Sequence, residues 1–162
     1  MRQNRISNQI IMKFNLVVLF LMLGATINAQ GINWISLEEA VELQKKEPRK
    51  IMIDAYTDWC GPCKLLDKNT FQNIEVSTYI NAHYYAVKFN AEGNSEVKFK
   101  EKTFKNPQFD PAKKGRNSVH ELTRYFGVSA YPTIVFLDEN SDLIGPIPGY
   151  KTPRQLELFL NL

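Results

Sequence analysis

Two cysteines separated by two residues, placed just after an apolar strand, constrain the fold of this chain more than any other feature. Residues Lys50–Tyr56 form a short, nearly continuous apolar run, which is typical of a strand buried on both faces of a sheet. Cys60 and Cys63 follow at the start of a helix that is expected to extend through Phe71. This spacing brings the two sulfurs within bonding reach at the N-terminus of the helix.

The position at a helix start predicts how the two thiols differ. Backbone N–H groups without partners and the positive end of the helix dipole favour a negative charge on Cys60. An ordinary thiol has a pKa of about 8.5 and is only slightly ionised near neutral pH, whereas the pKa of such a thiol is lowered. We expect Cys60, reached first by solvent, to attack a partner's disulfide, and the deeper Cys63 to resolve the mixed disulfide. Gly61 and Pro62 limit backbone freedom and help to set how oxidising the pair is.

A carboxylate is expected beside this pair. Asp54 lies on the buried strand, where an apolar setting would raise its pKa and suit it to move the proton of Cys63. The alternative is an aspartate that faces a loop near the strand end. Lys88, on the next predicted strand, either pairs with Asp54 or points to solvent. Trp59 is expected to line the reactive site, since its indole can cover the sulfurs and still form a hydrogen bond.

The rest of the chain alternates between helix and strand signals. Capping boxes at Ser36–Glu39 and Ser118–Glu121 predict two helix starts. Strands are expected at Tyr84–Phe89, Thr133–Leu137 and Asp142–Ile144, a helix around Glu75–Asn81, and a last helix capped at Thr152. This order predicts an α/β fold, with a central mixed β-sheet flanked by helices on both faces.

Residues 91–117 break this alternation. They are expected either as a small β-hairpin, with its turn at Glu101–Lys102, followed by a loop, or as a solvated surface loop. Their aromatic residues Phe99, Phe104 and Phe109 would either pin the segment to the core or contact a partner.

Two separate motifs give the chain a family resemblance. Residues Ile53–Lys64 closely resemble the active-site strand and helix of thioredoxins, and Phe126–Thr133 is similar to the segment that carries their cis-proline. Gly149 falls where that family has a glycine before its last helix. The similarity covers about residues 34–162 and implies a thioredoxin fold.

The resemblance also implies the roles of individual residues. Cys60 would be the attacking thiol, Cys63 the resolving thiol and Asp54 the buried proton acceptor. It also implies that Pro132 is in the cis form, faces the disulfide and helps to bind the substrate chain. The residues predicted to bind substrate are Trp59, Gly61, Pro62, Tyr131 and Pro132. The redox group would be the Cys60–Cys63 disulfide itself, with no further cofactor.

The sequence departs from a minimal thioredoxin in two places. Residues 91–117 look like an insertion before the cis-proline segment, and Tyr131 is bulkier than the aliphatic residue usual at its position. Both features lie where a substrate would approach, which favours a dedicated partner over a broad substrate range.

Residues 1–29 are predicted to be a secretory signal peptide. Leu16–Leu23 is an apolar core preceded by basic residues, and cleavage is expected near Ala29. The core is shorter than the ~20 residues that a membrane-spanning helix needs, and the alternative is an uncleaved N-terminal anchor. Residues 30–162 would then form a thioredoxin-like domain that is exported, in the periplasm or outside the cell.

Charge and ligand chemistry exclude other classes of protein. Beyond residue 30 the chain has 17 basic and 17 acidic side chains, so there is no basic excess for binding nucleic acid. A zinc site would need His83 and His120, which lie far apart in the sequence and are expected at helix ends, so no metal is predicted. A purely structural disulfide is disfavoured because closing so short a loop stabilises little.

The predicted function is therefore that of an enzyme, a protein-disulfide reductase. Reduction is favoured because the Gly61–Pro62 pair resembles that of reducing thioredoxins, and the substrates would be exported proteins that contain disulfides. In an oxidising compartment it would need an electron donor, which we expect to be a membrane thiol carrier. The alternatives are a disulfide donor or isomerase of the same fold, or a non-catalytic thioredoxin-like binding or chaperone module.

Overall fold

This computed structural model describes residues 31–160, so the predicted signal peptide lies outside the described residues. The strands are β1 (Trp34–Ile35), β2 (Lys50–Tyr56), β3 (Tyr84–Asn90), β4 (Val97–Phe99), β5 (Lys102–Phe104), β6 (Thr133–Leu137) and β7 (Leu143–Pro148). The helices are α2 (Leu37–Gln44), α3 (Gly61–Leu66), the π-helical turn η1 (Asp67–Phe71), α4 (Ile74–His83), α5 (Glu121–Tyr125) and α6 (Pro153–Leu160).

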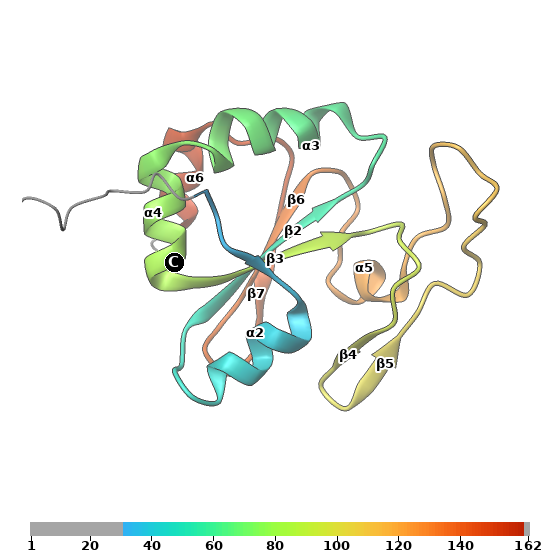
Figure 1. Cartoon of the computed structure of the whole chain (residues 1–162), viewed down its shortest axis with the longest axis horizontal. Coiled ribbons are helices and arrows are strands. Elements are labelled where there is room, and N and C mark those ends of the chain that lie inside the picture. Colours follow the sequence, from blue (N-terminus) through green and yellow to red (C-terminus); the bar gives the residue numbers. More distant parts are fainter. Residues whose placement is uncertain (1–30, 161–162) are drawn as a thin grey trace, which may run out of the picture.

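The main sheet has five strands in the order β1-β3-β2-β6-β7 (Figure 1). Strand β2 is central, parallel to β3 and antiparallel to β6, so the sheet is mixed as predicted. Its register places Asp54 beside Lys88 on one side and beside Ile134 on the other. A central strand is covered on both faces, which explains the nearly continuous apolar run of β2.

Helices cover both faces of the sheet, as predicted (Figure 1). The sheet therefore separates two hydrophobic cores, one on each face. Helices α2 and α5, with the β4–β5 hairpin, pack over Ile51, Ile53 and Ala55 on one face. Helices α3, α4 and α6 pack around Met52 on the other. Because side chains alternate along a strand, Asp54 lies on the same face as Met52, under α3 and η1.

Residues 91–117 are not simply a solvated loop. Strands β4 and β5 pair as an antiparallel hairpin, and Phe99 and Phe104 are buried in the first core. Lys100 and Glu101 form the turn with φ values of 47° and 60°, one residue earlier than predicted. Phe99 and Phe104 therefore anchor the segment to the core, which was one of the two predicted alternatives, whereas Phe109 is only half-buried.

The capping box predicted at Ser118–Glu121 is wrong. Helix α5 begins after His120, whose Nδ1 accepts the backbone N–H of Leu122 at 3.1 Å. The Ser118 hydroxyl instead donates to Asn106 Oδ1 at 2.7 Å. The Glu121 carboxylate accepts the backbone N–H of Lys105 at 2.8 Å. Both side chains of the motif therefore hold residues 105–106 rather than the helix start.

The other elements follow the predicted pattern with changed lengths. The helix after Cys60 extends through Phe71, but its last part, η1, is π-helical. Strand β7 is longer than the predicted Asp142–Ile144.

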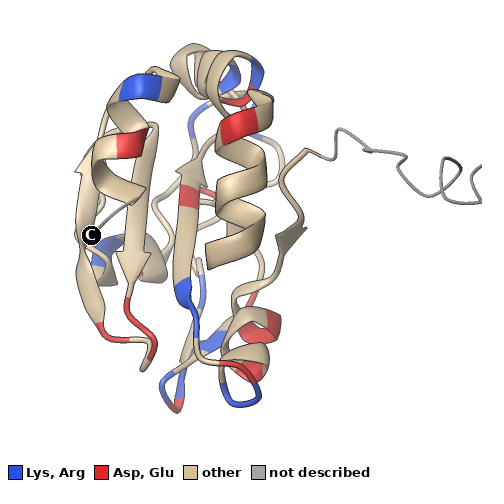
Figure 2. Ribbon diagram, turned by 90° about the vertical axis from the view of Figure 1, so that its left-hand side faces the viewer, with Lys and Arg blue, Asp and Glu red and all other residues tan. Residues whose placement is uncertain are grey.

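Within residues 31–160, no helix is long and apolar enough to cross a membrane. Acidic and basic residues occur together over the face shown in Figure 2, in keeping with their balanced numbers.

Candidate redox-active disulfide site

The two cysteines form a disulfide at the start of α3. Cys60 is the N-cap residue, and its Sγ accepts the backbone N–H of Cys63 at 3.1 Å. Their Cα atoms are 5.3 Å apart, and Pro62 lies in the first turn of the helix, where its missing N–H costs little. The helix N-terminus thus presents a backbone donor to the sulfur of Cys60, as the spacing of the motif predicted.

Exposure does not distinguish the two sulfurs in this disulfide form. Cys60 and Cys63 are each 2% exposed, so the expectation that solvent reaches Cys60 first is not met. Gly61 and Pro62 between them are exposed, and they form the accessible part of the motif.

Asp54 is the buried carboxyl predicted near the pair. It is 1% exposed, and its Oδ1 has no hydrogen-bonding partner among the described residues. Burial raises its pKa to about 6, an effect that the neighbouring Lys88 partly offsets. The loop-facing alternative is therefore wrong, and Asp54 is able to hold a proton near neutral pH.

Lys88 connects this carboxyl to a second one. Its Nζ lies 3.3 Å from Asp54 Oδ2 and also forms an ion pair with Asp67 Oδ1 at the start of η1. The negative charge of Asp67 adds to the rise in the Asp54 pKa. Exposure increases along this row, with side-chain values of 1%, 25% and 37% for Asp54, Lys88 and Asp67. The row therefore joins a buried proton acceptor to solvent.

The cis-proline segment is held near the end of the sheet. The peptide bond between Tyr131 and Pro132 is cis, and Pro132 is buried. Its carbonyl oxygen accepts the backbone N–H of Gly149 at 2.7 Å, which ties the segment to the end of β7. The ring of Tyr131 meets that of Trp59 edge to face, with centroids 5.9 Å apart. Tyr131 and Trp59, both predicted to bind substrate, are thus neighbours across the site.

Trp59 is also joined to the 91–117 segment. Its indole Nε1 donates to Glu92 Oε2 at 2.8 Å, and the same oxygen accepts the backbone N–H of Asn117 at 2.7 Å. The guanidinium of Arg116 lies over the indole, 4.4 Å from its centroid. The segment predicted to be an insertion therefore reaches the residue that precedes Cys60.

Sequence reasoning missed three of these residues. Asp67 follows Cys63 by about one helical turn, and this spacing was a signal that could have revealed it. Glu92 and Asn117 offered no such signal, because they lie far apart in the sequence and are joined by an irregular segment.

The histidines have structural positions. His83 ends α4, and the fully buried His120 caps α5, so both lie at helix ends as expected. Among the described residues, no group of three or more His, Cys, Asp and Glu side chains is placed to hold a metal ion.

The fold and the cysteine pair define a thioredoxin-like thiol-disulfide oxidoreductase. Residues 37–162 match the family model of the thioredoxin-like domain, and the chain belongs to this family. Over 126 residues, 74% of this chain, it is 29% identical to thiol:disulfide interchange protein DsbD of Haemophilus ducreyi. It covers only 18% of that protein and 21% of the DsbD of Actinobacillus pleuropneumoniae, about a fifth of each.

Solved structures show the same architecture. A protein from Bacteroides thetaiotaomicron, proposed to be a disulphide-isomerase, is 27% identical with a TM-score of 0.55. The similarity covers 82% of this chain and 93% of that one. A thioredoxin from Thermus thermophilus, 17% identical, has a TM-score of 0.58 over 82% of this chain and 86% of its own, and this likeness concerns the fold alone.

Proposed function

We propose that this protein is an exported reductase of protein disulfides, which acts by dithiol–disulfide exchange at Cys60 and Cys63. The observation that carries the proposal is the pairing of a disulfide at a helix N-terminus with the buried carboxyl of Asp54 on the strand that leads into it. A helix N-terminus stabilises the Cys60 thiolate, and a carboxyl with a pKa of about 6 can take a proton near neutral pH.

The exchange proceeds in two steps, attack by Cys60 and resolution by Cys63. In the reduced protein, the Cys60 thiolate attacks one sulfur of the substrate disulfide, so that a mixed disulfide forms and one substrate thiolate leaves. The Cys63 thiol then gives its proton to Asp54 and attacks the sulfur of Cys60. The mixed disulfide breaks, the second substrate thiol is released, and the protein ends in the disulfide form. Two electrons pass from the cysteine pair to the substrate.

Turnover requires a source of two electrons, and we propose a membrane thiol carrier that reduces the Cys60–Cys63 disulfide. The likeness to DsbD, a thiol:disulfide interchange protein, supports exchange between protein partners. Export through the N-terminal signal peptide would place the reaction outside the cytosol. Trapping with Cys63→Ser, which leaves Cys60 to hold each partner as a mixed disulfide, would identify the substrates and the donor.

Enzymatic function is tested by insulin reduction with dithiothreitol. We expect wild-type protein to accelerate the reaction and Cys60→Ser to be inactive, because the attacking sulfur is gone. Equal rates for the two proteins would remove the enzyme hypothesis and leave the binding or chaperone module as the interpretation.

The direction of exchange is tested by equilibrating the pair with glutathione. A reductase is expected near the potential of thioredoxin, about −270 mV, whereas a value near that of strong oxidants, about −120 mV, would make the protein a disulfide donor. The relative proposed to be a disulphide-isomerase makes isomerisation the second candidate. Refolding of a protein with scrambled disulfides would detect it.

A further inference from the structure

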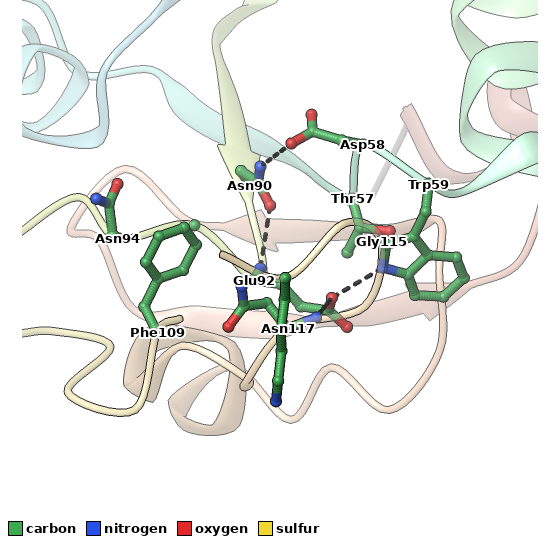
Figure 3. A pocket seen from close by; sticks show the side chains of 11 residues that line it. Thr57, Asp58, Trp59, Asn90, Glu92, Asn94, Phe109, Gly115 and Asn117 are labelled. Carbon is green, nitrogen blue, oxygen red and sulfur yellow. Dashed lines mark hydrogen bonds between the residues drawn. The ribbon is translucent and has the colours of Figure 1, made fainter. Parts of the chain in front are cut away.

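A pocket of about 410 Å³ lies between residues 57–59, which directly precede Cys60, and the 91–117 segment (Figure 3). Thr57, Asp58 and Trp59 form one side of it, and Glu92 and Phe109 contribute to the opposite side. This volume is more than sufficient for one large side chain. Because Trp59 directly precedes Cys60, a side chain in this pocket would come from the same substrate chain that Cys60 attacks.

The two carboxylates of the pocket, Asp58 and Glu92, have no ion-pair partner among the described residues. Glu92 is only 8% exposed, yet both groups that donate to its Oε2 are neutral N–H groups. Asp58 Oδ2 accepts from the side-chain amide of Asn90 at 3.0 Å, as Figure 3 shows. Lys113 is the one cation among the described residues that line the pocket, and the guanidinium of Arg116 lies next to the pocket over the Trp59 ring.

A buried hydroxyl in the lining has no partner of its own. Thr57 is 2% exposed, and its Oγ1 finds no hydrogen bond among the described residues. Leaving a buried polar group without a partner costs about 1–3 kcal/mol, so a donor that reached Oγ1 after a small shift of the lining would be stabilised. This observation is independent of the two carboxylates.

The aromatic lining favours a flat cation. Trp59 and Phe109 line the pocket, and the guanidinium of Arg116 lies over the Trp59 ring, 4.4 Å from its centroid, which shows that this ring binds a guanidinium. A guanidinium is planar, stacks on aromatic rings and donates from five N–H groups, whereas an ammonium is a compact point charge.

We propose that this pocket is a specificity subsite that accepts a basic side chain of the substrate, arginine in preference to lysine, within a few residues of the target cysteine. An extended chain rises about 3.3 Å per residue, so a side chain two or three residues away reaches the neighbouring pocket. The inference rests on the proposed function and names the class of substrate for the same site.

The test uses short peptides with an internal disulfide that differ at one position, two residues from the cysteine, which is Arg, Gln or Glu. Reduction by the fully reduced protein is followed by stopped-flow fluorescence. We expect the second-order rate constant of reduction to fall in the order Arg, Gln, Glu, with about a tenfold difference between Arg and Glu at low salt.

Three variants assign the preference to the pocket. Asp58→Asn and Glu92→Gln keep the size of the side chain and an acceptor oxygen, and each should lower the Arg-to-Gln ratio of rates several-fold. Lys113→Gln should raise that ratio. Asp142→Asn is the matched control, because it removes a carboxylate that pairs with Lys100 outside the pocket, and it should leave the ratio unchanged. A ratio taken within one variant is independent of how much of that variant is folded.

Failure of the subsite and failure of the proposed function are distinguishable. If wild-type protein reduces none of the peptides, the proposed function is wrong. If it reduces all three at equal rates, or if the Arg preference persists in both Asp58→Asn and Glu92→Gln, the subsite is overturned while the redox function stands.

Discussion

The two sides of Trp59 are built in different ways. On the side of the disulfide, a central strand leads into a helix, and these regular elements position Asp54, Cys60 and Cys63. On the other side, residues 91–117 include only one short hairpin. Much of this segment is held by side chains that bond to backbone, such as Asn106, whose Nδ2 donates to the carbonyl oxygens of Gly93 and Ser118.

The regular elements thus position the residues that exchange disulfides, whereas the irregular segment forms the pocket that we propose to select the substrate. Exchange between sulfurs needs a fixed helix start and a fixed carboxyl, which backbone hydrogen bonds of regular elements provide. A selective pocket can change with a few side chains in an irregular segment without moving the disulfide. We therefore expect substitutions in the two regions to affect different properties.

The largest effect is expected where the irregular segment joins the core. Phe99→Ala should lower the free energy of unfolding by about 3–5 kcal/mol. Phe99 is only 3% exposed, and the centroid of its ring lies 5.6 Å from that of Phe126. Urea denaturation measures this loss. The control Lys98→Ala, on the exposed side of the same strand, should stay within about 0.5 kcal/mol. Equal losses would mean that the hairpin is not part of the core.

Asp54→Asn should remove a pH dependence of stability. The folded-state pKa of Asp54 is raised from 3.8 to about 6, so the folded protein favours the protonated carboxyl. The stabilisation is fully present below pH 3.8 and is lost as the pH rises through about 6, a change of about 3 kcal/mol. Urea denaturation of oxidised wild type and variant from pH 4 to 8 should therefore give diverging curves. Parallel curves would contradict the buried carboxyl.

Asn106→Ala should lower the free energy of unfolding by about 1–3 kcal/mol, because it removes a buried amide and leaves the partly buried carbonyl oxygens of Gly93 and Ser118 without their donor. The loss should appear first as faster hydrogen exchange at residues 91–117, while exchange in α3 stays slow. Uniform acceleration over the whole domain would show that the segment and the disulfide region unfold together and would weaken the comparison above.

Asp67→Asn should have the smallest effect on stability, under about 1 kcal/mol, because its ion pair with Lys88 is partly exposed. It should instead lower the pKa of Asp54, since the charge of Asp67 contributes to raising it. The midpoint of the pH dependence of stability should thus move to lower pH. A midpoint that does not move would exclude electrostatic coupling between the two carboxyls.

How far the sequence predicts this molecule depends on how local each signal is. The bounds of β2 and the start of α3 were predicted correctly because an apolar run and a helix start involve neighbouring residues. The partner of Lys88 stayed open, since only the strand register places it beside Asp54. The Ser118–Glu121 motif misled because both side chains bond to residues 105–106, a contact with no periodic pattern. The link from Glu92 to Asn117 was unpredictable for the same reason.

The hydrogen bond between Trp59 and Glu92 gives the protein its own optical reporter. The chain has two tryptophans, and the other, Trp34, packs against Phe71 in the core under α3 and η1, with Lys88 Nζ 4.9 Å from the centroid of its ring. Emission from Trp59 is thus expected to respond to disulfide formation and to occupation of the adjacent pocket, whereas emission from Trp34 would report on the region around Lys88. A single Trp34→Phe substitution would leave one emitting indole at the site, so redox state and peptide binding can be followed without a label.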